Sequence, residues 1–230
     1  MCSRYSLTSP PEAVRAYFDV PPFEPFPPRY NIAPTQPVPI VHLDNGGRRT
    51  LTLVRWGLIP SWVKDPRTFS TLINARSETA AEKPSFRGAM RHRRCLVPTT
   101  GFYEWTGPAG AKRPQLIRPK GGGLMAMAGL FEHWLGADGS EVETMAILTT
   151  AANRLMSTIH DRMPVILAPE HFDFWLDTRA GRAAPVEGLL EPAPEGLLEI
   201  IPVNPKLNNP RHEGPDLQVP WTESGRSLLE

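Results

Sequence analysis

The chain has 230 residues, of which 40% are hydrophobic, 21% are charged and 27 are proline, and its formal net charge is +1. This length allows one sizeable hydrophobic core, and a proline content of roughly twice the average usage excludes long uninterrupted helices. A net charge near zero gives no general attraction for nucleic acid, so any such role requires locally concentrated positive charge.

The first quarter of the chain combines one expected helix with two expected strands. Residues 5–18 predict a short helix, and the proline-rich residues 21–28 predict an extended segment that packs on the surface. Strands are expected at residues 38–43 and 50–56, because the turn signal Asp44-Asn45-Gly46-Gly47 separates two apolar runs.

The middle of the chain reads mostly as strands. Residues 58–62 read as a loop, and Thr79 to Glu82 fit a capping box that opens a short helix limited by Pro84. Further strands are expected at residues 94–97, 101–105, 115–118, 124–130 and 144–150.

The last third is mixed. A helix is expected at residues 151–159, a strand at 165–167 and a second helix at 169–176. Residues 183–199 are rich in Pro, Gly and Glu and predict a mobile surface segment, after which residues 200–203 return to an apolar run. We therefore expect a single α+β domain over residues 1–230, with a mostly antiparallel, barrel-like β-sheet core and a few short helices.

The N-terminal residues and the number of cysteines indicate the cellular compartment. The start, Met1-Cys2-Ser3-Arg4-Tyr5, lacks the apolar core of a secretion signal, and no segment approaches the ~18 apolar residues of a membrane span. Cys2 and Cys95 are too few for a disulfide framework or a cysteine zinc site. We expect a cytoplasmic protein that needs no membrane, no metal and no cofactor.

Cys2 is the first candidate for chemistry, because removal of Met1 is permitted before a small second residue. The product carries an α-amine with a pKa near ~7.7–8.0 beside a thiol with a pKa near ~8.5. Such a 1,2-aminothiol condenses with an aldehyde, since the amine forms an imine and the sulfur closes it into a thiazolidine. The alternative is an incidental cysteine at the second position.

Three further side chains could move protons or orient a ligand. Glu104 lies in Phe102-Tyr103-Glu104-Trp105, where a strand puts Phe102 and Glu104 on one face, and aromatic neighbours would raise its pKa. His160 follows the helix expected at 151–159, where it could transfer protons or merely cap the last carbonyls. Asn74 could orient a nucleophile or simply form a turn.

Positive charge is densest in Phe86-Arg87-Gly88-Ala89-Met90-Arg91-His92-Arg93-Arg94. Such a run could follow a phosphate backbone, although its usual place is a solvated face. Trp56 and Trp62 could stack on bases, and core packing is the alternative for each.

Seven blocks in order resemble one known family. They are Cys2 with Arg4, Tyr30-Asn31-Ile32-Ala33-Pro34-Thr35, Arg55-Trp56-Gly57-Leu58-Ile59-Pro60, Ile73-Asn74-Ala75-Arg76-Ser77-Glu78-Thr79, Cys95-Leu96-Val97-Pro98, Gly101-Phe102-Tyr103-Glu104-Trp105 and Ile159-His160-Asp161-Arg162-Met163-Pro164. Together they resemble the SOS-response-associated peptidase family of abasic-site-processing proteins, over nearly the whole chain.

The resemblance implies a covalent thiazolidine between Cys2 and the ring-opened aldehyde of an abasic site in single-stranded DNA, which shields the lesion in the DNA damage response. It implies Asn74, Glu104 and His160 as the rest of the catalytic site: Glu104 manages the proton of the Cys2 amine, His160 protonates the sugar oxygen, and Asn74 holds the adduct. It also implies autoproteolytic removal of the N-terminus, a lyase activity on abasic sites, and a monomer associated with the chromosome or replication forks.

The resemblance also implies which residues contact DNA. Arg76 and Arg162 are expected at phosphates, and Arg4 is also expected to contact DNA. Pro34 and Trp62 fall in blocks similar to DNA-facing loops. Two positions depart from the family: Ser3 replaces the usual glycine after the cysteine, and Val63 stands where some relatives have a second tryptophan.

Two other functions share the same residues. The chain could be an N-terminal-nucleophile cysteine peptidase or amidohydrolase acting on peptides, with the Cys2 amine as its base. It could also be a non-catalytic nucleic-acid-binding module in which Cys2 is inert. The electrophile that reacts with Cys2, or the absence of one, separates the three.

Overall fold

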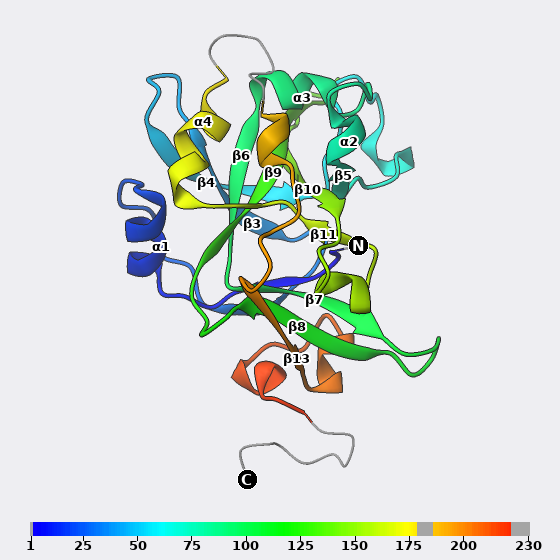
Figure 1. Ribbon diagram of the computed structural model, residues 1–230. Coiled ribbons are helices and arrows are strands. Elements are labelled where there is room, and N and C mark those ends of the chain that lie inside the picture. The colour runs from blue at the N-terminus through cyan, green and yellow to red at the C-terminus, as the bar shows by residue number, and fades with distance from the viewer. Residues whose placement is uncertain (1, 179–185, 222–230) are drawn as a thin grey trace.

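Two β-sheets with short helices at their margins make up the fold (Figure 1). The computed structural model describes residues 2–178 and 186–221. The first sheet has the strand order β13-β8-β7-β1-β2 and is antiparallel throughout. Its strands are β1 (Tyr5–Leu7), β2 (Arg29–Ile32), β7 (Gly101–Thr106), β8 (Arg113–Pro119) and β13 (Leu198–Pro202).

The second sheet closes on itself. Strand β10 pairs with both β4 and β9, and the path β10-β4-β3-β6-β9 returns to β10, so five strands form a ring. All pairings are antiparallel except those of β10 with β4 and β5. Its strands are β3 (Pro37–Leu43), β4 (Arg49–Trp56), β5 (Asn74–Arg76), β6 (Arg94–Thr99), β9 (Met125–Leu135), β10 (Glu141–Ala151), β11 (Arg162–Pro164) and β12 (Ile166–Leu167). The expected α+β fold with a barrel-like, mostly antiparallel core is confirmed.

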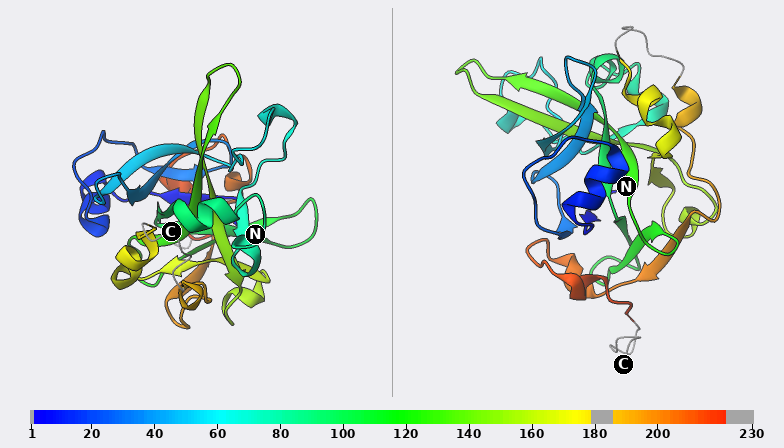
Figure 2. Two further views of the ribbon diagram at one scale, coloured as in Figure 1. Left: turned by 90° about the horizontal axis from the view of Figure 1, so that it is seen from above. Right: turned by 90° about the vertical axis from the view of Figure 1, so that its left-hand side faces the viewer.

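The helices are short, as the proline content requires. They are α1 (Pro11–Phe18), α2 (Ser77–Ala80), α3 (Arg87–His92) and α4 (Phe172–Leu176), with 3-10 turns at Pro66–Thr68, Met156–Thr158, Pro169–His171, Glu187–Leu189, Pro205–Asn208 and Pro215–Gln218. In Figure 1, α1 lies at the left and α3 at the top, and the views in Figure 2 show the β9–β10 hairpin projecting from the body. None of the helices in the described part of the chain has the length and apolarity needed to cross a membrane.

The hydrophobic core divides along the two faces of the first sheet. Phe102 belongs to the large cluster inside the ring, whereas Tyr103 and Trp105 pack with a smaller cluster on the other face. This alternation along β7 confirms the predicted facing of Phe102 and Glu104 on one side. The carboxylate of Glu104 therefore points toward the junction of the two sheets.

Most expected strands are confirmed, and several are longer than the sequence indicated. The expected strand at residues 124–130 extends to Leu135 in β9, and that at 144–150 begins at Glu141 in β10. The proline-rich residues 21–28 form neither helix nor strand, and Phe23 and Phe26 stack with ring centroids 5.5 Å apart against the core. That segment packs on the body, as predicted.

The helix expected at residues 5–18 is wrong in its first part. Tyr5 to Leu7 form strand β1 between β2 and β7, and the helix begins only at Pro11. Pro10 and Pro11 prevent a helix from running through them, because proline lacks the N–H and disfavours helical geometry before it. All three residues of β1 are buried, so sheet pairing decides their conformation.

The helix expected at residues 151–159 is also wrong. Strand β10 continues to Ala151, which pairs with Arg162, and only Met156–Thr158 form a 3-10 turn. The Oδ1 of Asn153 accepts the N–H of Met156 at 2.9 Å, and such side-chain bonds compete with an extended helix. Further along, residues 169–176 form a 3-10 turn followed by α4, which confirms that expected helix.

The capping box at Thr79 is wrong as well. Helix α2 begins at Ser77 with no side-chain bond at its cap, and Thr79 lies inside it. Helix α3, which follows at Arg87, was not predicted from the sequence.

The segment 183–199, expected to be mobile, has two different parts. Residues 183–185 lie outside the described residues. Val186 and Ala193 are buried in the large core cluster, and Leu198 begins β13. These contacts tie the segment to the body, and its mobility stays a prediction.

Candidate active site

The candidate residues converge where the two sheets meet. Cys2 lies three residues before the start of β1 in the first sheet, and Glu104 lies on the neighbouring strand β7. Asn74 begins β5 of the second sheet, and His160 lies in the connection from β10 to β11. Four residues that are far apart in the sequence thus come from elements at the meeting of the two sheets.

Cys2 is held by its backbone. Its side chain is 1% exposed, and its carbonyl oxygen accepts a hydrogen bond from Nδ2 of Asn74 at 2.8 Å. The thiol donates weakly to the carbonyl of Arg4, with Sγ 3.7 Å from the oxygen. Burial raises the pKa of the Cys2 thiol far above its ordinary value, and the negative charge of Glu104 raises it further. The thiol is therefore protonated at neutral pH.

Glu104 is a buried carboxyl with a perturbed pKa. It is 5% exposed, and desolvation raises the pKa of its carboxyl above the ordinary 4.5, while the positive charge of His160 acts in the opposite direction. A carboxyl shifted toward neutral pH can accept and return a proton during a reaction. Because the charge of Glu104 acts on both Cys2 and His160, the three groups lie together.

Asn74 is positioned by parallel pairing of β5 with β10, in which it lies opposite Ile147. Its Nδ2 donates a hydrogen bond to the carbonyl oxygen of Cys2. Its Oδ1 is buried and has no hydrogen-bond partner within residues 2–178 and 186–221. A buried acceptor of this kind is costly unless a ligand donor satisfies it.

Nδ1 of His160 contacts the two residues that follow it. It accepts the backbone N–H of Arg162 at 2.9 Å, and it lies 2.9 Å from Oδ1 of Asp161. In the described residues only a 3-10 turn precedes His160, so it does not cap an α-helix.

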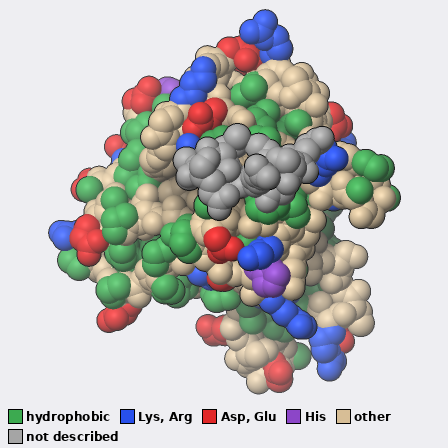
Figure 3. Space-filling model, turned by 90° about the horizontal axis from the view of Figure 1, so that it is seen from below, with side chains coloured by type: hydrophobic (Ala, Val, Ile, Leu, Met, Phe, Trp, Pro, Cys, Tyr) green, Lys and Arg blue, Asp and Glu red, His purple; other side chains and the backbone are tan. Residues whose placement is uncertain are grey.

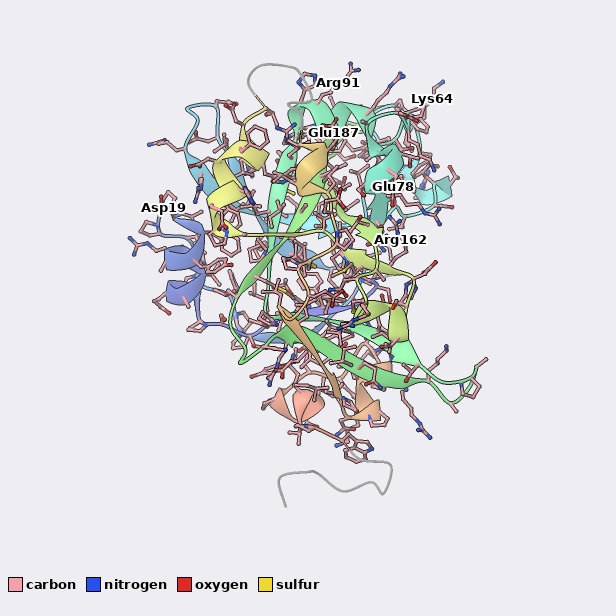
Figure 4. All side chains as sticks on the ribbon, viewed as in Figure 1. Asp19, Lys64, Glu78, Arg91, Arg162 and Glu187 are labelled. Atoms are coloured by element: carbon pink, nitrogen blue, oxygen red, sulfur yellow. The ribbon has the colours of Figure 1, made fainter. Side chains whose placement is uncertain are left out.

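Two of the expected DNA-contacting arginines are engaged within the protein. Arg162 forms a two-point ion pair with Glu78, whose Oε2 lies 2.8 Å from Nη2, and also donates to the carbonyl of Thr149 at 2.6 Å. Glu78 and Arg162 lie close to each other in Figure 4. Arg4 donates to Oδ1 of Asn31 at 2.6 Å and lies over the ring of Trp105. Each guanidinium is oriented by these contacts.

The other three expected DNA-contacting residues are more open. Arg76 is exposed at the end of β5, and its guanidinium forms no hydrogen bond or ion pair with the described residues. Trp62 is 57% exposed and meets Phe69 edge-on at 5.7 Å. Pro34 is half-buried in the turn after β2.

A hollow of about 510 Å³ lies beside the N-terminal strand and was not found from the sequence. Ser3, Arg4, Trp105, Lys112 and Asn208 line it, and Nε1 of Trp105 donates to Oδ1 of Asn208 at 2.7 Å. Lys112 stands outside the blocks that resemble the family, so only the tertiary structure brings it to this hollow. Ser3, where a glycine was expected, faces this hollow.

Tyr5 is a second residue that sequence reasoning missed. Its hydroxyl is buried without a hydrogen-bond partner among the described residues, and its ring meets Trp56 edge-on at 5.2 Å. Burial raises the pKa of this phenol. A neutral phenol therefore lies near the nucleophile. The adjacent Cys2 block was the only signal that could have pointed to it.

Comparison with known proteins gives a consistent result. A profile described as SOS response associated peptidase (SRAP) matches residues 1–210. The chain is 38% identical over 221 residues to the abasic site processing protein YoqW of Bacillus subtilis, covering 94% of this chain and 98% of that protein. It is 33% identical to the mouse abasic site processing protein HMCES, covering 84% of this chain and 65% of the mouse protein.

A solved structure shares the fold. The crystal structure of a protein from Bacteroides thetaiotaomicron matches with a TM-score of 0.81 at 28% sequence identity, and the match covers 94% of this chain and 98% of that one.

Proposed function

Because the chain belongs to the SOS response associated peptidase family, we propose that it processes abasic sites in single-stranded DNA through a covalent bond at Cys2. The relatives named above are called abasic site processing proteins. The observation that carries the proposal is the clamp on Cys2: Asn74 fixes its carbonyl at 2.8 Å while Glu104 and His160 lie close by. This clamp orients the backbone of the nucleophilic residue, which a merely incidental cysteine would not need.

The first step requires removal of Met1, which converts the backbone nitrogen of Cys2 into an α-amine. The family name supports a cut made by the protein itself, in which water hydrolyses the Met1–Cys2 bond and free methionine is released. After removal, the amine attacks C1′ of the ring-opened deoxyribose, and loss of one water leaves an imine. Glu104 takes the proton released by the amine, which its raised pKa allows near neutral pH.

Ring opening must precede that attack, because the closed sugar has no aldehyde. We assign to His160 the protonation of the sugar oxygen as the C1′–O4′ bond breaks. Its Nδ1 is held by contacts with Arg162 and Asp161. O4′ keeps this proton as the 4′ hydroxyl, and the proton that the C1′ hydroxyl loses as the aldehyde forms goes to His160 or to solvent.

Thiazolidine closure completes the reaction. The sulfur of Cys2 bonds to the imine carbon, and the thiol proton moves to the nitrogen, so the final adduct equals protein plus DNA minus one water. Closure also removes the C=N bond that would otherwise promote loss of the 3′ phosphate. Lyase activity is thus a side reaction of the open imine, and closure suppresses it.

A single-stranded substrate fits the burial of the site. Cys2 is 1% exposed, so the abasic sugar must leave any base stack to reach it. Extrusion of a nucleotide costs least in a single strand.

The peptidase or amidohydrolase alternative requires a Cys2 sulfur that reacts with peptides in general. A thiolate is the usual nucleophile of such enzymes, and burial beside Glu104 disfavours that form of Cys2. An amine-first reaction does not need the thiolate, so the geometry favours the aldehyde as the electrophile.

Intact-protein mass spectrometry tests the proposal. The protein is mixed with an oligonucleotide that carries one abasic site, and we expect an adduct with the mass of protein without Met1, plus DNA, less one water. Cys2→Ala should abolish it, and Cys2→Ser should give imine and strand cleavage without a stable adduct. A crosslink that survives Cys2→Ala, or one that tolerates extra uncleaved residues before Cys2, would overturn the assignment.

A further inference from the structure

A cavity of about 520 Å³ lies between α2, the end of β10 and the 3-10 turn at Glu187–Leu189. All the charged side chains among its described lining residues are acidic: Glu78, Glu82, Glu187 and Glu191. Glu78 lies on α2 and Glu187 on the turn (Figure 4). On the face of the molecule in Figure 3, by contrast, acidic and basic side chains are interspersed. Carboxylates gathered around one cavity repel each other and attract a cation.

Three of the four carboxylates have no cationic partner. Glu78 forms the two-point ion pair with Arg162, and that contact lowers the pKa of its carboxyl. The carboxylates of Glu82, Glu187 and Glu191 form no ion pair or hydrogen bond within residues 2–178 and 186–221. Glu187 and Glu191 are four residues apart and line the same cavity, so the fold brings like charges together there.

Two buried hydroxyl groups line the same cavity. Ser77 is 8% exposed and Thr150 is 5% exposed. Neither hydroxyl forms a hydrogen bond with the described part of the chain. Buried polar groups are normally paired, so these two hydroxyls point to a ligand independently of the glutamates. Every polar side chain that lines the cavity can accept a hydrogen bond, and only the hydroxyls can also donate one.

The rest of the lining is apolar. Met90 of α3, Leu190 and Pro192 contribute to it. The described residues contain no group of three or more His, Cys, Asp or Glu side chains placed to hold a metal ion. A volume of several hundred Å³ is typical of a small-molecule site. The cavity therefore suits an organic cation with methylene groups between its charges.

The turn that forms one side of the cavity is fixed to the body. Val186, which precedes the turn, is buried in the core. Beyond the turn, the carbonyl of Ala193 accepts a hydrogen bond from Nδ2 of Asn153 at 3.0 Å. Glu195 accepts the backbone N–H of Arg154 at 2.7 Å. Because the side of the cavity is already held in place, little ordering opposes the binding of a ligand.

We propose that this cavity binds a linear aliphatic polyamine, whose ammonium groups contact the carboxylates and hydroxyls while its methylene groups pack on Met90 and Leu190. A protonated primary amine has three donors and no acceptor, which matches a lining rich in acceptors. A peptide would also bring main-chain carbonyls, for which only two hydroxyl donors are present. DNA would be repelled by the glutamates, so the site goes beyond the proposed function and does not depend on it.

Isothermal titration calorimetry of the full chain with spermidine, in the absence of DNA, tests the site. We expect a single spermidine per protein and an affinity that falls as salt is added. Hexaamminecobalt(III) carries the same positive charge without methylene groups. It should bind at least about fivefold more weakly, because it gains nothing from the apolar wall.

Matched variants make the outcome specific. Glu187→Gln/Glu191→Gln should weaken spermidine binding about tenfold. Glu12→Gln/Glu24→Gln removes the same charge from exposed glutamates of α1 and the proline-rich segment, and its effect should stay within about twofold. Thr150→Val removes a hydroxyl that has no partner to lose. It should weaken spermidine binding about fivefold without lowering the Tm of the free protein.

Four results would overturn the inference. They are an equal loss in the two glutamate variants, binding of hexaamminecobalt(III) as tight as that of spermidine, unchanged binding by Thr150→Val, or tighter binding of a Lys-Gly-Lys peptide, which would assign the cavity to a protein partner. The proposed function is tested separately, by adduct formation with abasic DNA. Glu187→Gln/Glu191→Gln should form that adduct like the wild type, so either proposal can fail without the other.

Discussion

Asn74→Ala removes the bond that holds the backbone of the nucleophilic residue. The bond from Nδ2 to the carbonyl of Cys2 is 2.8 Å long and contributes about 1 kcal/mol net. The carbonyl left without a donor beside a buried side chain costs about 1–2 kcal/mol more. Together these amount to about 2–3 kcal/mol against the reactive position of Cys2, which corresponds to a crosslinking rate ~30–150-fold lower.

The assay is a single-turnover crosslinking reaction with an abasic oligonucleotide, followed by denaturing gel electrophoresis. Asn74→Asp should be at least as slow, because a carboxylate oxygen would then face the Cys2 carbonyl oxygen. Asn45→Ala, in the exposed β3–β4 turn, is the control and should react like the wild type. A rate for Asn74→Ala within about threefold of the wild type, in a protein with unchanged Tm, would refute the clamp.

Three further predictions concern the charged residues around the site and the core. Because the raised pKa of Glu104 makes the folded protein bind a proton more tightly than the unfolded chain, wild-type stability falls as pH rises above the ordinary 4.5. Glu104→Gln should therefore have a higher Tm than the wild type only above that pH, and it should crosslink more slowly. A Tm difference that does not depend on pH would show that burial does not raise the pKa of Glu104. Arg162→Ala, which loses its contacts with Glu78, should lower the free energy of unfolding by about 1–2 kcal/mol. Arg76→Ala should weaken DNA binding without changing the midpoint of urea denaturation. The reverse pattern would exchange the roles of the two arginines. Arg94→Met should cost at least about 3 kcal/mol in urea denaturation because three carbonyls lose their donor, and an unchanged midpoint would show that they find others.

The strands were predictable where the alternation of apolar and polar side chains agreed with the turn signals. Phe102 and Glu104 share a face as the period of two requires, and the Asp44–Gly47 turn joins two strands at the expected residues. The ring closure by β10 was not predictable, because it depends on parallel pairing with Arg55 and Trp56 of β4 that leaves no local signal.

Helices were the weakest part of the sequence reasoning for a physical reason. Residues 5–7 have the apolar spacing of either element, and pairing with two neighbouring strands decides their conformation. In residues 151–159, Asn153 and the end of β10 use backbone groups that a helix would need. Both errors come from hydrogen bonds to neighbouring strands and, at Asn153, to a side chain, which overrule helix preference.

The basic run shows the same limit for function. Composition assigned equal weight to Arg87, Arg91, Arg93 and Arg94, and only burial and ion pairing separate them. Arg94 is buried and Arg93 pairs with Glu132, whereas Arg87 and Arg91 are exposed. Conversely, Arg162 was expected at a phosphate, and its two-point pair with Glu78 orients it within the protein. A charge in a sequence becomes a binding group only where the fold leaves it unneutralised.

Burial raises the pKa values of both the Cys2 thiol and the Glu104 carboxyl. In the proposed reaction, these shifts determine which atom of Cys2 reacts first. Burial and Glu104 keep the thiol protonated at neutral pH, whereas an α-amine has a pKa near ~7.7–8.0 and is partly neutral there. The amine is therefore the available nucleophile, and its proton can pass to a carboxyl whose own pKa is raised by burial. The sulfur becomes useful only after the imine has formed, when a neutral thiol can supply both the bond and the proton. Under the proposed function, burial disfavours Cys2 as an ordinary thiolate nucleophile but not as an N-terminal amine, so removal of Met1 would be the step that activates the site.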